Sequence, residues 1–242
     1  MIKGKRMLVV SAHAADYVWR AGGTIAKYIK EGADVHVVVL SFGVRGESND
    51  LWKQEGATAD SVKAVRRAET KAAAEVLGVE QIEFWDLQDY PMQFNTELEE
   101  RLVRKIRAVQ PDIILTHDRY DVLNPDHNQV SDFTYRCSIM SNSNGVKLEG
   151  TKTTKQMRIF GFEPHQTELS DFKPDSLIDI TDVYEQKITA MKCFKAQSHL
   201  IEYYTQRAFL RGNHLRRISG NQSFKYGESF ANYFPTAGEE LV

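Results

Sequence analysis

Two histidines and one aspartate in this sequence have the spacing of ligands for a catalytic metal ion. His13 and Asp16 lie three positions apart, directly after the apolar run 7–12, so both side chains can reach one centre. His127 lies in a polar segment that follows another apolar run, at 112–117. Two histidines and one carboxylate leave coordination positions open for water or substrate, which suits Zn²⁺, Fe²⁺ or Mn²⁺. Spacing alone leaves a purely structural alternative, in which His13 closes a strand and Asp16 caps a helix.

The elements that must position these side chains alternate between strands and helices. Continuous valine, isoleucine and leucine runs separated by helical segments predict a parallel sheet covered on both faces. Right-handed crossovers then give a doubly wound, mostly parallel, Rossmann-like α/β sheet, in which ligands bind beyond the carboxyl ends of the strands. Strands are expected at 7–12, 35–40, 82–85, 112–117, 157–162 and 176–180. Helices are expected at 18–31, 57–77, 96–109 (after an N-cap at Asn95), 183–199 and 201–212, with another starting near 124–127.

One α/β domain is expected across residues 1–242, because no linker, repeat or low-complexity tract divides the chain. The core is expected over about 1–165, with the strands and capping helices of about 166–242 packed beside it as a helical C-terminal cap.

Composition limits the classes of binding partner and the cellular compartment that we expect for this protein. The chain has 31 basic and 33 acidic residues, and this balance argues against bulk binding to nucleic acid or to an anionic membrane. No apolar run approaches the ~20 residues that span a bilayer, and the apolar stretch after the basic N-terminus is too short for a signal peptide. Cys137 and Cys193 lack CxxC spacing, so we expect two buried, reduced thiols and a cytoplasmic protein.

A longer motif resembles a known family. After Asp16, five residues intervene before Gly22-Gly23-Thr24, and Pro125-Asp126-His127 follows much later in the chain. This pattern is similar to that of the LmbE/PIG-L zinc-dependent deacetylases. The resemblance implies that His13, Asp16 and His127 hold Zn²⁺. It also implies a homo-oligomer, since many members of the superfamily self-associate.

One departure from the deacetylase pattern bears on the reaction. Those enzymes have a pair of aspartates, of which the first acts as general base, and the corresponding residue here is Ala15. A methyl group accepts no proton, and general-base catalysis typically contributes ~10²–10⁴ in rate.

A narrower resemblance is to the hydratase branch of the superfamily, 4-oxalomesaconate (4-carboxy-2-hydroxymuconate) hydratase. The matching segments are 11–20, 40–48, 89–92, 162–166 and 199–205. The resemblance implies hydration of a C=C bond conjugated to a 2-oxo acid, in gallate and protocatechuate catabolism. Two alternatives stay open: a deacetylase of an N-acetylated sugar with a substitute base, and a non-catalytic metal-binding or sugar-binding relative.

Hydration needs one group to activate water and another to protonate carbon. Glu47 and His165 are the candidates, because each follows a predicted strand. The plainer alternatives are a surface ion pair between Glu47 and Arg45, and a structural turn histidine. A small-molecule polycarboxylate substrate would need cationic clamps and a cleft wall, for which the candidates are Arg45, Arg119, Arg207, Arg211 and Tyr204. The segment 45–56 is either a lid over the substrate or an ordinary loop.

Overall fold

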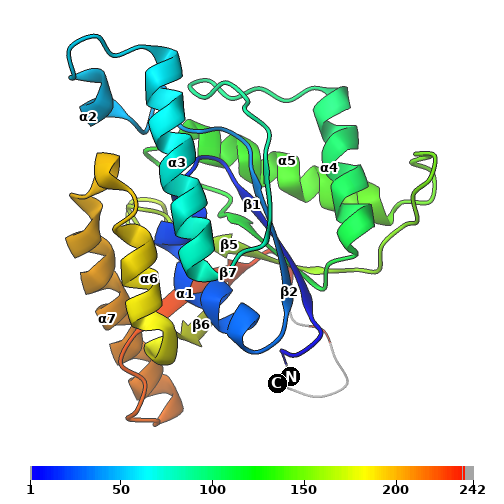
Figure 1. The fold of residues 1–242 in the computed structure, drawn as a ribbon. Helices are drawn as coiled ribbons and strands as arrows, with labels where there is room; N and C mark the ends of the chain where they lie inside the picture. The colour runs from blue at the N-terminus through cyan, green and yellow to red at the C-terminus, as the bar shows by residue number, and fades with distance from the viewer. Residues whose placement is uncertain (1, 236, 238–242) are drawn as a thin grey trace.

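A twisted seven-stranded sheet runs through the centre of the computed structural model, which describes residues 2–235 and 237 (Figure 1). The strand order is β3-β2-β1-β4-β5-β7-β6. The strands are β1 (Arg6–Ser11), β2 (Asp34–Val39), β3 (Gln81–Phe84), β4 (Ile113–His117), β5 (Arg158–Phe162), β6 (Ser176–Asp179) and β7 (Gly227–Asn232). The strands from β3 to β5 are parallel, whereas β7 is antiparallel to both β5 and β6. The prediction of a mostly parallel, doubly wound sheet is confirmed.

Helices cover both faces of the sheet, as Figure 1 shows. One face carries α1 (Asp16–Lys30), α3 (Ala59–Leu77), α6 (Tyr184–Met191) and α7 (Leu200–Ser219); the other carries α4 (Thr96–Val109) and α5 (Pro125–Asn142). The strands supply both cores because successive side chains point to opposite faces. In β1, Val9 packs into one core and Val10 into the other. This two-sided burial explains why the strands read as continuous apolar runs.

The C-terminal part differs from the sequence prediction in three places. The expected helix 183–199 is wrong: α6 ends at Met191, and a short 3₁₀ turn, Lys195–Gln197, follows. The break lets Phe194 bury itself against Trp19, with ring centroids 5.9 Å apart. The helix expected at 201–212 extends through α7 to Ser219, and strand β7 was not anticipated at all.

Local signals set the helix ends close to the site. Asn95 caps α4, as predicted, by accepting the Leu98 N–H at 2.9 Å. Asn124 caps α5 in the same way through the His127 N–H, so the helix starts within the polar segment 124–127. A short helix, α2 (Asn49–Trp52), interrupts the loop 45–56.

The structure also bears on the expectations for the two cysteines and for membrane-spanning helices. Both cysteines are free thiols, but only Cys137 is buried, whereas Cys193 is partly exposed at the end of α6. Among the described residues, no helix combines the length and the apolar character needed to cross a bilayer.

Strands β1 and β4 are neighbours at the point where the strand order reverses, which is where ligands bind in open α/β sheets. His13 follows β1, Glu47 follows β2, and His127 lies at the start of the helix that follows β4. The topology therefore brings segments far apart in the chain to one edge.

Candidate active site

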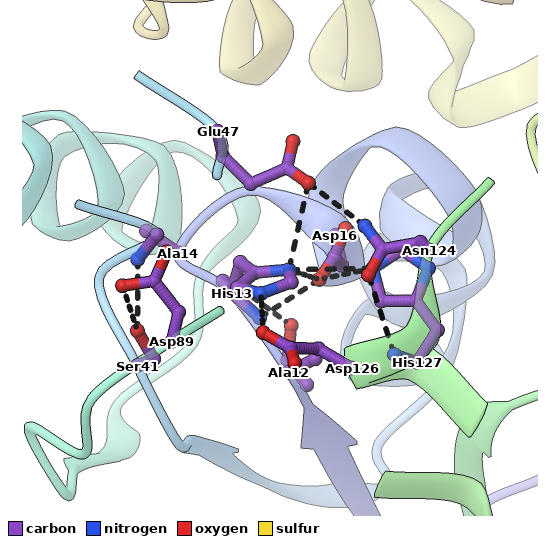
Figure 2. A network of polar contacts seen from close by, with 12 residues as sticks. Ala12, His13, Ala14, Asp16, Ser41, Glu47, Asp89, Asn124, Asp126 and His127 are labelled. Atoms are coloured by element: carbon purple, nitrogen blue, oxygen red, sulfur yellow. Dashed lines mark hydrogen bonds and ion pairs between the residues drawn. The ribbon is translucent and has the colours of Figure 1, made fainter. Parts of the chain in front are cut away.

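His13, Asp16 and His127 converge as the sequence predicts (Figure 2). One ligand atom from each lies within 4.8 Å of the other two, and all three residues are buried. The Nδ1 atom of His13 is 3.2 Å from Asp16 Oδ2, and the Nε2 atom of His127 is 3.4 Å from the same oxygen. These three donors point at one small volume, which is the geometry of a metal site with open coordination positions.

Each histidine turns its other ring nitrogen to a buried carboxylate. His13 Nε2 lies 3.3 Å from Asp126 Oδ2, and His127 Nδ1 lies 2.9 Å from Asp121 Oδ2. Such carboxylates fix the tautomer and ring orientation of a metal-binding histidine and raise its basicity. Asp126 also accepts the backbone N–H groups of Tyr90 and Met92, both at 2.9 Å. The three predicted ligands suit a divalent cation, and so do the carboxylates that hydrogen-bond to the two histidines.

The electrostatics of the pocket also favour a cation. Burial disfavours a charged imidazole, yet the carboxylates of Asp126, Asp16 and Glu47 outweigh it and raise the pKa of His13 to about 10. In His117, by contrast, burial and the neighbouring His127 hold the pKa well below its usual value. Its ring stacks on that of His127 with centroids 3.9 Å apart. The pocket is thus rich in negative charge that a metal ion would neutralise.

Glu47 reaches over His13 from the loop after β2 (Figure 2). Its Oε1 atom accepts from Asn124 Nδ2 at 2.9 Å and lies 3.8 Å from His13 Nδ1. Its Oε2 atom accepts from Gln197 Nε2 at 3.1 Å. Glu47 is therefore bound within the site, and no ion pair with Arg45 occurs among the described residues.

The loop that carries Glu47 is tied to the segment after β3. The Asp89 carboxylate accepts the N–H groups of Arg45 and Gly46 at 2.8 and 2.7 Å. Gly46 leaves no room for a side chain, because a Cβ atom there would overlap the Tyr90 ring. The tight attachment at 45–46 places Glu47; whether the rest of 45–56 closes over substrate stays a prediction.

His165 lies in the turn after β5 and lines the same cavity as Glu47, Asp16 and His127. The volume of this cavity is about 170 Å³, and a wider groove of about 530 Å³ shares Glu47 and His165 with it. Burial, with the nearby charges of Arg20 and Arg207, lowers the pKa of His165 to about 4. Its imidazole is therefore neutral near pH 7.

The predicted substrate clamps occupy different surroundings. Arg207 donates to the backbone carbonyls of Pro164 and His165, and Arg211 pairs with Glu163 inside the protein. The remaining two arginines are exposed: Arg119 donates to the carbonyl of Tyr233, and Arg45 lies on the loop beside Glu47.

Tyr204 is buried and lines the cavity, as does Arg20, which the sequence reasoning missed. The Nε atom of Arg20 is buried and has no hydrogen-bond partner among the described residues. Sequence reasoning also missed Tyr90, Asp121, Asn124 and Gln197. The segments that resemble the hydratase branch contain Arg20 and Tyr90, and this was the available signal.

The fold and the site define the class of protein. The PIG-L family model, GlcNAc-PI de-N-acetylase, matches residues 8–138, and the chain belongs to this family. The resemblance seen in the sequence is confirmed.

The chain is also similar to individual proteins of this family. A 4-oxalmesaconate hydratase of Pseudomonas putida is 42% identical to the chain over 241 residues, which cover 98% of the chain and 93% of that protein. The crystal structure of GalB, the 4-carboxy-2-hydroxymuconate hydratase from Pseudomonas putida KT2440, matches with a TM-score of 0.94 at 41% identity and covers 98% of this chain and 100% of that one. A diacetylchitobiose deacetylase of Thermococcus kodakarensis is 28% identical and covers 80% of this chain and 70% of that protein.

Proposed function

We propose that this protein is a zinc-dependent hydratase that adds water to the C=C bond of 4-oxalomesaconate or its tautomer 4-carboxy-2-hydroxymuconate. The observation that carries the proposal is the cavity in which Glu47 and His165 lie beside the convergent metal ligands. The hydratase relatives match nearly the whole chain, which supports the same reaction.

Position 15 supports hydration over amide hydrolysis. Ala15 is the N-cap residue of α1, is only 2% exposed and packs in the core. The general base of the deacetylase pattern is therefore missing, because the methyl group of Ala15 accepts no proton. A carboxylate is still present in the cavity, but it comes from Glu47 on a different loop.

The metal site would supply the electrophile. His13, Asp16 and His127 would hold Zn²⁺, for which two imidazoles and one carboxylate are suitable ligands. When bound, the ion acts as a Lewis acid that stabilises negative charge developing on a substrate oxygen.

The protein's own side chains carry out the proton transfers. Glu47 and the neutral His165 can between them take one proton from water and deliver one to carbon, so that the elements of water add across the double bond without net proton change. Arg20 supplies positive charge at the cavity wall for a polycarboxylate, because it lines the cavity with these two residues.

The direct test mixes zinc-loaded protein with 4-carboxy-2-hydroxymuconate and follows the loss of the conjugated ultraviolet absorbance. We expect rapid decay that disappears in His13→Ala. Decay no faster than the uncatalysed rate, in protein shown to contain zinc, would overturn the substrate assignment.

The deacetylase alternative has its own test, the release of acetate from N-acetylglucosamine conjugates. The variant Ala15→Asp restores the missing carboxylate, so it would raise acetate release only in a deacetylase. We expect no acetate release from either protein.

We extend the proposal to the setting of the reaction. The free thiols of Cys137 and Cys193 suit a reducing cytoplasm. The family resemblance supports a homo-oligomer, which light scattering on the purified protein would reveal.

A further inference from the structure

The turn that carries His165 is held by guanidinium groups. Three consecutive backbone carbonyls, those of Glu163, Pro164 and His165, each accept an N–H from an arginine. Arg20 Nη1 donates to the first at 2.9 Å. Arg207 donates to the second from Nη1 at 2.5 Å and to the third from Nη2 at 2.7 Å. Hydrogen bonds from a charged donor are roughly twice as strong as neutral ones, so the main chain of this turn is firmly held.

The start of the turn is anchored to α7 as well. The buried Glu163 carboxylate accepts from Arg211 Nε at 2.9 Å and from Thr167 at 2.8 Å, and its Oε1 atom lies 3.5 Å from Arg207 Nε. Burial alone would keep this carboxyl neutral, but Arg211 and Arg207 lower the pKa of Glu163 below its usual value. The ionised carboxylate therefore links the end of β5 to the helix.

Arg207 also supports the surface on which the imidazole rests. The His165 ring stacks on the Tyr203 ring with centroids 4.2 Å apart and an interplanar angle of 9°. The Arg207 guanidinium lies 4.6 Å from the centre of the same Tyr203 ring and contacts its hydroxyl. That hydroxyl in turn donates to the carbonyl of His165. One guanidinium thus holds both the backbone of His165 and the ring beneath its side chain.

We propose that Arg207 is a positioning residue, which fixes the 163–165 turn and the Tyr203 ring so that the imidazole of His165 faces the cavity beside the metal ligands. The inference rests on the proposed function, in which His165 acts on the substrate. It replaces the direct clamp predicted from the sequence. Arg207 does not line the 170 Å³ cavity, and all three of its nitrogen atoms face groups of the protein itself.

The first test observes the position of His165 without using the reaction. Histidine ring signals are recorded by ¹H–¹³C NMR on the intact protein, and the His165 signal is identified by its loss in His165→Ala. We expect Arg207→Ala to shift this signal, because the imidazole leaves the Tyr203 ring. Arg217→Ala, at an exposed position of the same helix, is the control and leaves the signal in place. An unmoved signal in Arg207→Ala overturns the inference.

The second test is a double-mutant cycle on hydration. A displacement of about 1 Å can cost ~10²-fold in rate, so Arg207→Ala should lower kcat by about 10–100-fold with little change in KM. In a His165→Ala background the same change should have almost no further effect, because both residues act through one imidazole. Arg207→Lys should restore part of kcat by donating to one carbonyl.

Two outcomes of this cycle would contradict the proposal. A raised KM at unchanged kcat would show that Arg207 binds substrate directly, and full additivity with His165→Ala would show that Arg207 acts independently of His165. If the unmodified protein fails to hydrate the substrate, the proposed function fails, and the NMR measurement still decides the position of His165. If Arg207→Ala does not fold, Arg207→Lys takes its place in both measurements.

Discussion

Asp121 should tune the metal affinity although it is not itself a predicted ligand. Its Oδ2 atom lies 2.9 Å from His127 Nδ1, which leaves the Nε2 lone pair of that ring facing Asp16. In the variant Asp121→Asn the shape and the Leu123 N–H contact at 3.2 Å can persist, but the negative charge is lost. The change therefore keeps the size of the side chain and removes its charge and its acceptor oxygen beside His127.

The expected magnitude follows from burial. The Asp121 side chain is 4% exposed, so solvent does little to screen its interaction with the imidazole. Loss of such a supporting carboxylate typically costs 10–100-fold in metal affinity, or about 1.4–2.8 kcal/mol. The upper half of that range is expected here. An asparagine that keeps the Leu123 contact through its oxygen would place its NH2 group where Oδ2 lies, facing both His127 Nδ1 and Arg20 Nη2.

The assay is a competition titration of metal-free protein against a chromophoric zinc chelator near pH 7. Asp132→Asn is the matched control, because it removes an exposed carboxylate of α5 that forms an ion pair with Arg136 and lies outside the site. Exposed pairs of this kind contribute about 0–1 kcal/mol, so zinc affinity should not change. A zinc affinity in Asp121→Asn within twofold of the unmodified protein would refute the reasoning about the carboxylate and the tautomer.

Three further predictions concern the proton-transfer groups and the loop that places one of them. Glu47→Gln keeps the size of the side chain and one of its two acceptor contacts, to Asn124 or Gln197, but cannot act as a base; kcat for hydration should fall by ~10²–10⁴ while bound zinc, measured by atomic absorption, stays unchanged. Gly46→Ala should lower kcat because its Cβ would displace the Tyr90 ring and with it the loop of Glu47; Gly145→Ala, where a Cβ meets no atom within 4 Å, is the control. Because burial and nearby arginines lower the pKa of His165 to about 4, its neutral form persists as the pH falls through 6.5. We expect kcat to hold down to about pH 5 and to be lost on the acid side of about pH 4; an inflection near 6.5 in a pH–rate profile would contradict this.

Local sequence determined the central sheet and the first two metal ligands. The apolar runs of β1, β2 and β4 are buried from both sides, so their composition alone indicates parallel strands. His13 and Asp16 lie at the two ends of one four-residue strand-to-helix turn, and their convergence needs no distant contact. The lack of a base at position 15 is likewise a property of the chain alone.

The weaker predictions lay in the C-terminal part, where local pattern and packing disagree. The stretch 183–199 has a helical pattern, but burial of Phe194 breaks it and delivers Gln197 to Glu47. Strand β7 (Gly227–Asn232) has no apolar run, and it exists because β5 and β6 offer pairing edges on either side.

Only the tertiary structure decided which charged groups face the substrate and which face the protein. Arg207 and Arg211 share a helix face at a spacing of four, and this spacing fits a substrate clamp and an internal anchor equally well. The docking of α7 beside β7 and β6 turns both guanidinium groups toward Glu163 and the turn of His165 after β5. Burial then favours the internal partners, because an arginine withdrawn from water must find acceptors close by, and the nearest are the carboxylate and carbonyls of that turn.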